Sequence, residues 1–263
     1  MTQTRLNSEA QFQDERMRRA LAGEPDIRDK FYFINIEAYT KYVSLLEDLH
    51  GRRVVVVGSS DGGVTPLARQ KAFVEGIDIS PVSIEALRRA IEKEGLSQFA
   101  SARVMDAERM EYPAASIDVI SCSGVLHHLD TERAIHSWSR CLKTDGFVAL
   151  FEPLAFHPVA ALFRLLTPRM RTSDEHPLRT RDFRLMEKYF AQVEPNFYGI
   201  TTVVCAAIAV LPGCRTIARR ALPGFVSLDR WLLRTFPCLR RICWLTVVRL
   251  SSPKRTDMPT PDA

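Results

Sequence analysis

Residues 52–78 constrain the fold of this chain more than any other stretch, because they read as strand, turn, helix and second strand. Residues 54–57 are four consecutive valines, which is typical of a parallel strand covered on both faces. The glycine-bearing turn at residues 58–63 follows, and glycine lets the backbone approach a ligand where a Cβ would collide. The second strand ends in Asp78, a carboxylate positioned to accept hydrogen bonds from a ribose diol. The pattern predicts a nucleoside-binding βαβ unit.

Strands and helices continue to alternate after this unit. Further buried strands are expected at residues 102–105, 116–121 and 146–151, with helices at 81–95 and 131–142. Two later segments, residues 191–198 and 244–250, have the apolar character of a sixth and a seventh strand. Alternation at this spacing predicts an α/β fold with a doubly wound, mostly parallel, Rossmann-like sheet.

Five parts are expected along the chain. They are an N-terminal helical lid (1–50), an α/β core (51–199), a basic apolar helical cap (200–243), the last strand (244–250) and a disordered tail (251–263).

The lid carries a series of aromatic residues that has two interpretations. The aromatics could pack the helix onto the sheet, or Tyr32 or Tyr39 could reach a bound ligand. The sequence leaves both open. The series comprises Phe31, Tyr32, Phe33, Tyr39 and Tyr42.

Charge and cysteine content limit the functional classes. The net charge is +5, but residues 200–255 hold ten Lys/Arg and one acid, so the rest of the chain has a net charge of −4. A surface designed for nucleic acid is therefore not indicated. The six cysteines have no metal-ligand spacing, and the polar N-terminus has no secretory h-region. We expect a cytoplasmic protein with reduced thiols.

The ordered motifs GSSDGG, GIDIS, MDA, SIDVI and GVLHHL resemble those of class I S-adenosylmethionine-dependent methyltransferases. The similarity covers roughly residues 51–153 and is greatest to the small-molecule branch that contains ubiquinone-biosynthesis enzymes. It implies a seven-stranded sheet with an antiparallel last strand, and S-adenosylmethionine as the cofactor.

The resemblance implies that the turn containing Gly58, Ser59, Ser60 and Gly62 passes under the methionine and ribose portions of the cofactor. Two positions depart from the family pattern. Val56 stands where the family usually has an acid that helps to hold the methionine amino group, and Ser60 replaces the middle glycine. A non-catalytic domain of this fold is therefore an alternative.

Other cofactor contacts are carried over by the same resemblance. Asp78 would accept both ribose hydroxyls, and Ile79 would pack on the adenine. Asp106 would accept the adenine amine beside the Ala107 amide, and Ser123 would line the methionine end.

Catalytic candidates are the polar side chains near the carboxyl ends of strands four and five, because ligands bind at that edge. A histidine there could deprotonate an acceptor hydroxyl. The candidates are His127, His128, Glu152 and His157, with His128 also expected to contact the cofactor. Residues 164–183 could be an acceptor-recognition loop or a solvated, self-paired one. No metal site is expected, because the consecutive residues Asp174, Glu175 and His176 cannot easily converge on one ion.

The predicted function is methyl transfer to a small, lipophilic or aromatic acceptor. The basic cap at residues 200–243 could cover an apolar pocket or touch a membrane surface. The N-terminal aromatic helix could mediate a homodimer. A nicotinamide-dependent oxidoreductase is a weaker alternative, because the chain has no Tyr-x-x-x-Lys pair beside its motifs.

Overall fold

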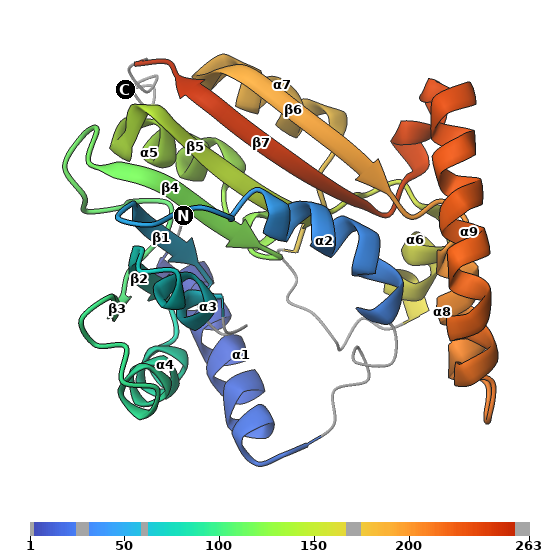
Figure 1. The fold of residues 1–263 in the computed structure, drawn as a ribbon, viewed down its shortest axis with the longest axis horizontal. Coiled ribbons are helices and arrows are strands. Elements are labelled where there is room, and N and C mark those ends of the chain that lie inside the picture. Colours follow the sequence, from blue (N-terminus) through green and yellow to red (C-terminus); the bar gives the residue numbers. More distant parts are fainter. Residues whose placement is uncertain (1–2, 25–31, 59–62, 167–174, 256–263) are drawn as a thin grey trace.

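A single seven-stranded sheet forms the centre of the part of the chain that the structure describes, which comprises residues 3–24, 32–58, 63–166 and 175–255 of a computed structural model (Figure 1). The strand order is β3-β2-β1-β4-β5-β7-β6, with β7 antiparallel to both of its neighbours. The predicted doubly wound, mostly parallel sheet is confirmed. The strands are β1 (Arg53–Val57), β2 (Phe73–Asp78), β3 (Ala100–Val104), β4 (Ile117–Ser123), β5 (Leu142–Pro153), β6 (Phe190–Tyr198) and β7 (Leu245–Pro253).

Helices connect the strands, and two of them begin at a residue whose side chain caps the helix. The Ser80 hydroxyl accepts the Ser83 amide at 3.0 Å, and the Asp130 carboxylate accepts the Arg133 amide at 3.1 Å. The α-helices are α1 (Gln3–Leu21), α2 (Ile36–Ser44), α3 (Val64–Arg69), α4 (Pro81–Lys93), α5 (Thr131–Cys141), α6 (Pro158–Leu166), α7 (Thr180–Tyr189), α8 (Val203–Val210) and α9 (Arg215–Thr235). Three 3-10 helices are η2 (Tyr32–Asn35), η4 (Leu126–His128) and η6 (Pro237–Ile242).

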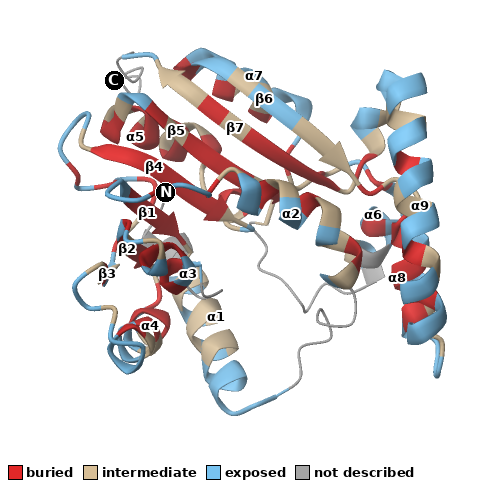
Figure 2. Ribbon diagram, viewed as in Figure 1, coloured by how far each residue is buried: buried red, intermediate tan, exposed pale blue. Residues whose placement is uncertain are grey.

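The valine strand explains how the sheet is covered on both faces. Alternate side chains of a strand point to opposite faces. Val55 and Val57 join the core that contains residues of α5 and α7, whereas Val54 and Val56 join the core that contains residues of α2, α3 and α4. All four valines are buried, and Figure 2 shows the central strands as the most buried part of the fold. The layers leave the carboxyl ends of the strands as the open edge.

The N-terminal helices pack in two places. Helix α1 lies against α4, where Asp14 accepts a hydrogen bond from the Ser80 hydroxyl. Helix α2 lies on the sheet, and the Tyr42 hydroxyl is 2.6 Å from the Ser121 hydroxyl of β4. Burial raises the pKa of Tyr42. Tyr32 and Tyr39 are more than half exposed.

Packing is therefore the role of Tyr42, the aromatic residue that is buried. The sequence predicts a helical lid that extends to residue 50, whereas α2 ends at Ser44. Phe31 lies outside the described residues.

Helices α8 and α9 stand together at one end of the sheet, between β6 and β7 in the sequence (Figure 1). The buried carboxylate of Asp229 in α9 holds the segment that leads into α8. It accepts the amides of Ile200 at 3.0 Å and Thr201 at 2.7 Å, and the Thr201 hydroxyl at 2.6 Å. Within the described residues, no helix combines the length and the apolar character needed to cross a bilayer.

The last strand is longer than predicted, so the expectation of a disordered tail from residue 251 onward is wrong for residues 251–255. Strand β7 continues to Pro253 because it pairs with β6 up to Phe190. The Arg255 guanidinium then donates to the carbonyls of Ser139, Arg140 and Leu142 at 2.7–2.9 Å. Residues 256–263 lie outside the described part.

Candidate active site

A pocket opens at the carboxyl ends of β1, β2, β3 and β4, where the layered fold leaves the sheet edge uncovered. Loops after these four strands form its floor, and helix α1 adds one wall. The lining residues are Glu9, Gln13, Arg16, Val57, Gly58, Ile77, Asp78, Ile79, Met105, Asp106, Ala107, Ser123, Gly124, Val125, His128 and Leu129. Seven of the residues predicted to hold a cofactor are thus brought together. They are Gly58, Asp78, Ile79, Asp106, Ala107, Ser123 and His128.

Gly58 is the residue that the pocket can least replace. Its φ angle is +75°, a conformation that other L-residues rarely adopt. A Cβ at this position would lie 2.1 Å from Cγ2 of Val125. The strand-to-turn junction therefore requires glycine on both backbone and steric grounds. Ser59, Ser60 and Gly62, the other predicted turn contacts, lie outside the described residues.

Two carboxylates face the pocket from neighbouring strand ends. Asp78 is buried, and its Oδ1 accepts the Ser80 amide at 2.9 Å. Asp106 accepts the Glu108 amide at 2.9 Å through its Oδ1. These local hydrogen bonds fix the carboxylates at the ends of their strands, as the sequence predicted from the GID and MDA motifs.

Helix α1 contributes pocket residues that sequence reasoning missed. Glu9, Gln13 and Arg16 line the pocket, and Gln13 Nε2 donates to Glu9 Oε1 at 2.8 Å. Glu9 Oε1 also lies 3.4 Å from Nδ1 of His128. The spacing of Glu9, Gln13 and Arg16 on one helix face was the available signal.

Val56 has no access to this pocket. Its side chain is buried in the core beneath α2 and α3, on the face opposite to Val57. Because residue 56 is a valine, this position of β1 supplies no carboxylate, and Glu9 of α1 brings one to the pocket instead.

Glu152, predicted as catalytic, is fully buried at the end of β5. Its Oε1 accepts the amides of Val125 at 3.0 Å and Leu126 at 2.8 Å, and its Oε2 is 2.7 Å from Nδ1 of His127. Burial, with the Glu152 charge nearby, raises the pKa of the Cys122 thiol. Glu152 thus organises the turn that carries the two histidines, and acts on a ligand only through them.

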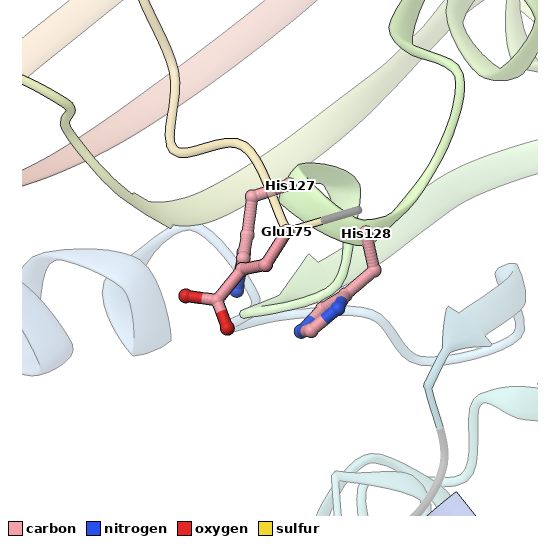
Figure 3. Close-up of side chains that lie close together, drawn as sticks. All are labelled: His127, His128 and Glu175. Carbon is pink, nitrogen blue, oxygen red and sulfur yellow. The ribbon is translucent and has the colours of Figure 1, made fainter. Parts of the chain in front are cut away.

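The adjacent histidines of η4 lie side by side. Their ring centroids are 4.2 Å apart with an angle of 39° between the rings. Glu175 reaches the same place from the segment before α7, and Figure 3 shows its carboxylate beside the two rings. One donor atom from each of the three residues lies within 4.8 Å of the others.

His157 occupies a different position from the two η4 histidines. Its Nδ1 accepts the Ala160 amide at 3.3 Å, and its Nε2 donates to the Ile200 carbonyl at 3.0 Å. The side chain is buried and is not among the residues that line the pocket. It joins the start of α6 to the segment after β6, and its role as a base stays a prediction.

The polar segment at residues 164–183 lies partly outside the described residues, since residues 167–174 are not described. Of its described acids, Asp182 is buried and accepts the Arg179 amide at 2.7 Å, which caps α7. A recognition role for this segment stays a prediction.

Comparison with known families identifies the core of the chain. Residues 55–150 match the model of the methyltransferase domain. The ubiquinone/menaquinone biosynthesis C-methyltransferase UbiE of Methylococcus capsulatus is 26% identical over 140 residues, which are 51% of this chain and 56% of that protein. The aklanonic acid methyltransferase DauC of a Streptomyces species is 31% identical over 130 residues, 46% of this chain and 59% of that protein. The chain thus spans less than two thirds of the length of these relatives.

Solved structures agree on the fold. The geranyl diphosphate C-methyltransferase of Streptomyces coelicolor, in complex with Mg²⁺, geranyl diphosphate and S-adenosyl-L-homocysteine, superposes with a TM-score of 0.55 at 12% identity. The superposition covers 82% of this chain and 79% of that one. The [4+2]-cyclase SpnF superposes with a TM-score of 0.53 at 17% identity, over 82% of each chain. At these identities the likeness establishes the fold alone.

Proposed function

We propose, from the class I methyltransferase domain that this chain carries, that the protein transfers a methyl group from S-adenosylmethionine to a small, lipophilic or aromatic acceptor. The observation that carries the proposal is the convergence of Gly58, Asp78 and Asp106 on one pocket at the carboxyl edge of the sheet. The alternative of a non-catalytic domain rests on Val56 and Ser60, and Ser60 lies outside the described residues.

The described residues fit an adenosyl cofactor. The glycine at residue 58 keeps the end of β1 clear of a Cβ, as a backbone that passes under a ligand requires. The buried Asp78 carboxylate stands at the end of β2, where a ribose diol would donate to it, and Asp106 stands at the end of β3. The cofactor would supply the electrophilic methyl group on its sulfonium. The protein's task is then to orient two reactants.

Glu9 is proposed to hold the methionine amino group in place of the acid that is missing at Val56. It lies 3.4 Å from His128, a residue that the family resemblance assigns to the cofactor side of the pocket. Its side chain is 14% exposed, so solvent screens its charge only weakly. Because α1 packs on α4, this contact would also link the N-terminal helix to cofactor binding.

Of the four predicted catalytic residues, we propose only His127 and His128 as groups that act on the acceptor. Glu152 positions His127, and His157 is engaged with backbone groups away from the pocket. His128 lines the pocket and His127 stacks beside it, so acceptor activation is proposed to occur next to η4.

The nature of the acceptor is inferred from the relatives and from the surface. The relatives are named for quinone biosynthesis and for aklanonic acid, both of which point to apolar or aromatic acceptors. In the cap, Ile217, Trp231 and Phe236 are about half exposed or more and stand beside exposed arginines such as Arg234. A basic face with bulky apolar side chains suits a membrane interface. We propose peripheral membrane contact through residues 200–243.

The cofactor assignment is tested by calorimetric titration with S-adenosylhomocysteine and, separately, with NADH. The protein should bind the first and not the second. Asp78→Ala should weaken binding by roughly 10- to 100-fold, since hydrogen bonds to a charged group contribute about 1.5–3 kcal/mol. The matched control is Asp145→Ala, which removes a largely exposed carboxylate. Equal affinity for S-adenosylhomocysteine in Asp78→Ala would contradict the proposal.

Two further measurements address the partners. Methyl transfer to a panel of phenols and quinols would exclude the non-catalytic alternative. Sedimentation with anionic vesicles, compared with neutral ones, tests the membrane contact, and Trp231→Glu should reduce it. A homodimer stays a prediction, to be checked by sedimentation equilibrium.

A further inference from the structure

Three side chains with metal-binding atoms come together next to the pocket, which one of them, His128, also lines. They are His127 and His128 of η4, and Glu175 of the segment that precedes α7. All three extend to the same side of the ribbon in Figure 3. We propose that they bind one divalent transition-metal ion, and that this ion holds an oxygen atom of the methyl acceptor.

The separation of the donor atoms is compatible with a metal site that closes on binding. One donor atom of each residue lies within 4.8 Å of the other two. Tetrahedral ligands at about 2.0–2.1 Å from an ion are roughly 3.3 Å apart. The donors must therefore approach by about 1.5 Å at most, a change that side-chain rotation of the half-buried Glu175 can supply.

The histidine ligands are already supported by carboxylates. A metal-binding histidine usually donates its other ring N–H to a carboxylate, which fixes the tautomer and the ring orientation. Nδ1 of His127 lies 2.7 Å from the fully buried Glu152. Nε2 is then the nitrogen that would bind the ion. Glu9 Oε1 lies 3.4 Å from Nδ1 of His128, a longer contact than the one that supports His127.

Backbone contacts hold Glu175 next to this pair although it is distant in sequence. The amide of the next residue, His176, donates to the His127 carbonyl at 2.8 Å. Two residues further on, the Leu178 amide donates to the Pro153 carbonyl at 2.9 Å, beside Glu152. The segment is thus hydrogen-bonded to both elements that position the histidines. The sequence argument against a metal considered only the consecutive residues 174–176, and not this group of side chains from different elements.

The chemistry of the three donors selects the kind of ion. Two imidazoles and one carboxylate favour zinc, cobalt or iron over magnesium, which prefers an all-oxygen set. Three protein ligands leave at least one position open for a further oxygen ligand.

The ligand class follows from the open position, and this step rests on the proposed function. An acceptor with a phenol or enol oxygen could bind the ion as an anion, because a bound cation favours the deprotonated form of an oxygen ligand. His128 lines the cofactor pocket, so the oxygen would be held next to the cofactor. The structure thus assigns the acceptor to the oxygen-bearing aromatics or enols.

Cobalt titration of the untagged full chain, followed by visible absorption, tests the site directly. One Co²⁺ should bind per chain, with a spectrum that has no thiolate charge-transfer band and is abolished by competing Zn²⁺. Glu175→Gln and His128→Gln should each weaken Co²⁺ binding by roughly tenfold or more, in line with the loss of a ligand or of its support. His50→Gln, which removes an exposed histidine outside the pocket, should bind Co²⁺ as the unmodified chain does.

Any one of three results would overturn the metal site. They are Co²⁺ binding at a ratio other than one ion per chain, a spectrum with a thiolate charge-transfer band, and unchanged Co²⁺ affinity in both Glu175→Gln and His128→Gln. S-adenosylhomocysteine titration of the same variants separates this result from the proposed function. Glu175→Gln should retain cofactor affinity, since Glu175 is not among the residues that line the cofactor pocket. Cofactor binding without cobalt binding would refute the metal alone, and cobalt binding without cofactor binding would refute the methyltransferase proposal alone.

Discussion

The two halves of the sheet's carboxyl edge use acidic side chains in opposite ways. In the half formed by β1, β2 and β3, Asp78 and Asp106 line the pocket and make short local hydrogen bonds. In the half formed by β4, β5 and β7, Glu152 faces inward, is fully buried and binds the turn that carries the histidines. The first half presents its carboxylates to the pocket, and the second half uses its carboxylate to position the turn that carries the histidines.

This difference separates binding from stability. Asp78 and Asp106 each accept one backbone amide beside the pocket, so their removal should have a smaller effect on folding, because water in the pocket can reach the freed amide. Glu152 accepts two amides and pairs with His127 where it is fully buried, so its removal leaves several donors without partners. The two halves should therefore respond differently to the same substitution.

The largest effect is expected for Glu152→Ala. The substitution leaves the amides of Val125 and Leu126 buried without an acceptor and removes the partner of His127. The free energy of unfolding should fall by about 3–5 kcal/mol. Urea denaturation measures the change.

Glu152→Gln keeps the volume and one acceptor oxygen, so it should lose less stability than Glu152→Ala. Glu132→Ala is the control, because it removes a carboxylate that is paired with Lys188 at the surface. If Asp106→Ala destabilised the protein as much as Glu152→Ala, the distinction between the two halves would be wrong.

The next largest effect is expected for Gly58→Ala, and it concerns the binding of S-adenosylhomocysteine. A methyl group 2.1 Å from the Val125 Cγ2 atom forces the turn to move, and overpacking of this kind costs about 1–3 kcal/mol. We expect roughly 100-fold weaker binding of S-adenosylhomocysteine by calorimetry, at the upper end of that cost.

The control for this substitution is Gly95→Ala. Gly95 has a φ of +68°, and no atom lies within 4 Å of the place that an added methyl group would occupy, so this variant reproduces the backbone strain without the clash. It should leave binding unchanged. Equal binding by Gly58→Ala would mean that the end of β1 does not approach the cofactor.

The same comparison explains which parts of the site could be predicted from sequence. Gly58 directly follows β1, Asp78 ends β2 and Asp106 lies two residues after β3, so chain order alone brings them to one edge. Glu9 and Glu175 reach the pocket region through tertiary packing, of α1 on α4 and of residue 176 on His127. The spacing of Glu9, Gln13 and Arg16 indicates which residues of α1 share a face, but not which part of the fold that face meets. Glu152 was found by its position, but its role depends on which way the side chain points.

Fold prediction from the sequence succeeded for the same reason and failed at the ends of elements. The valine run and the helix caps determine where β1 and α4 lie. The end of β7 depends on its pairing with β6, a contact between distant segments that the sequence of residues 251–255 does not reveal.

A smaller effect is expected for Asp229→Asn, which extends the comparison to the cap. Asp229 uses both oxygens to accept the amides that lead into α8, and asparagine offers only one. The free energy of unfolding should fall by about 1–2 kcal/mol, while affinity for S-adenosylhomocysteine stays unchanged. Urea denaturation and calorimetry test the two parts, with Ser227→Ala on the exposed face of α9 as the control. Weaker cofactor binding would show that the cap and the cofactor pocket are coupled.

The smallest effect concerns Asp118, a carboxylate at the start of β4, away from the pocket. Burial alone would raise its pKa, but hydrogen bonds from the Arg53 amide and the Lys143 ammonium outweigh burial and hold the pKa below its ordinary value of 3.8. A carboxyl group whose pKa is lowered in the folded state stabilises the protein at pH values above its ordinary pKa. This stabilisation is lost as the pH falls through the folded-state pKa. Asp118→Asn should therefore lower the free energy of unfolding by about 1 kcal/mol at neutral pH, a low figure because Lys143 is partly exposed. The difference between the two proteins should shrink as the pH falls below 3.8 in urea denaturation. A difference that did not depend on pH would assign the effect to hydrogen-bond geometry and not to the charge.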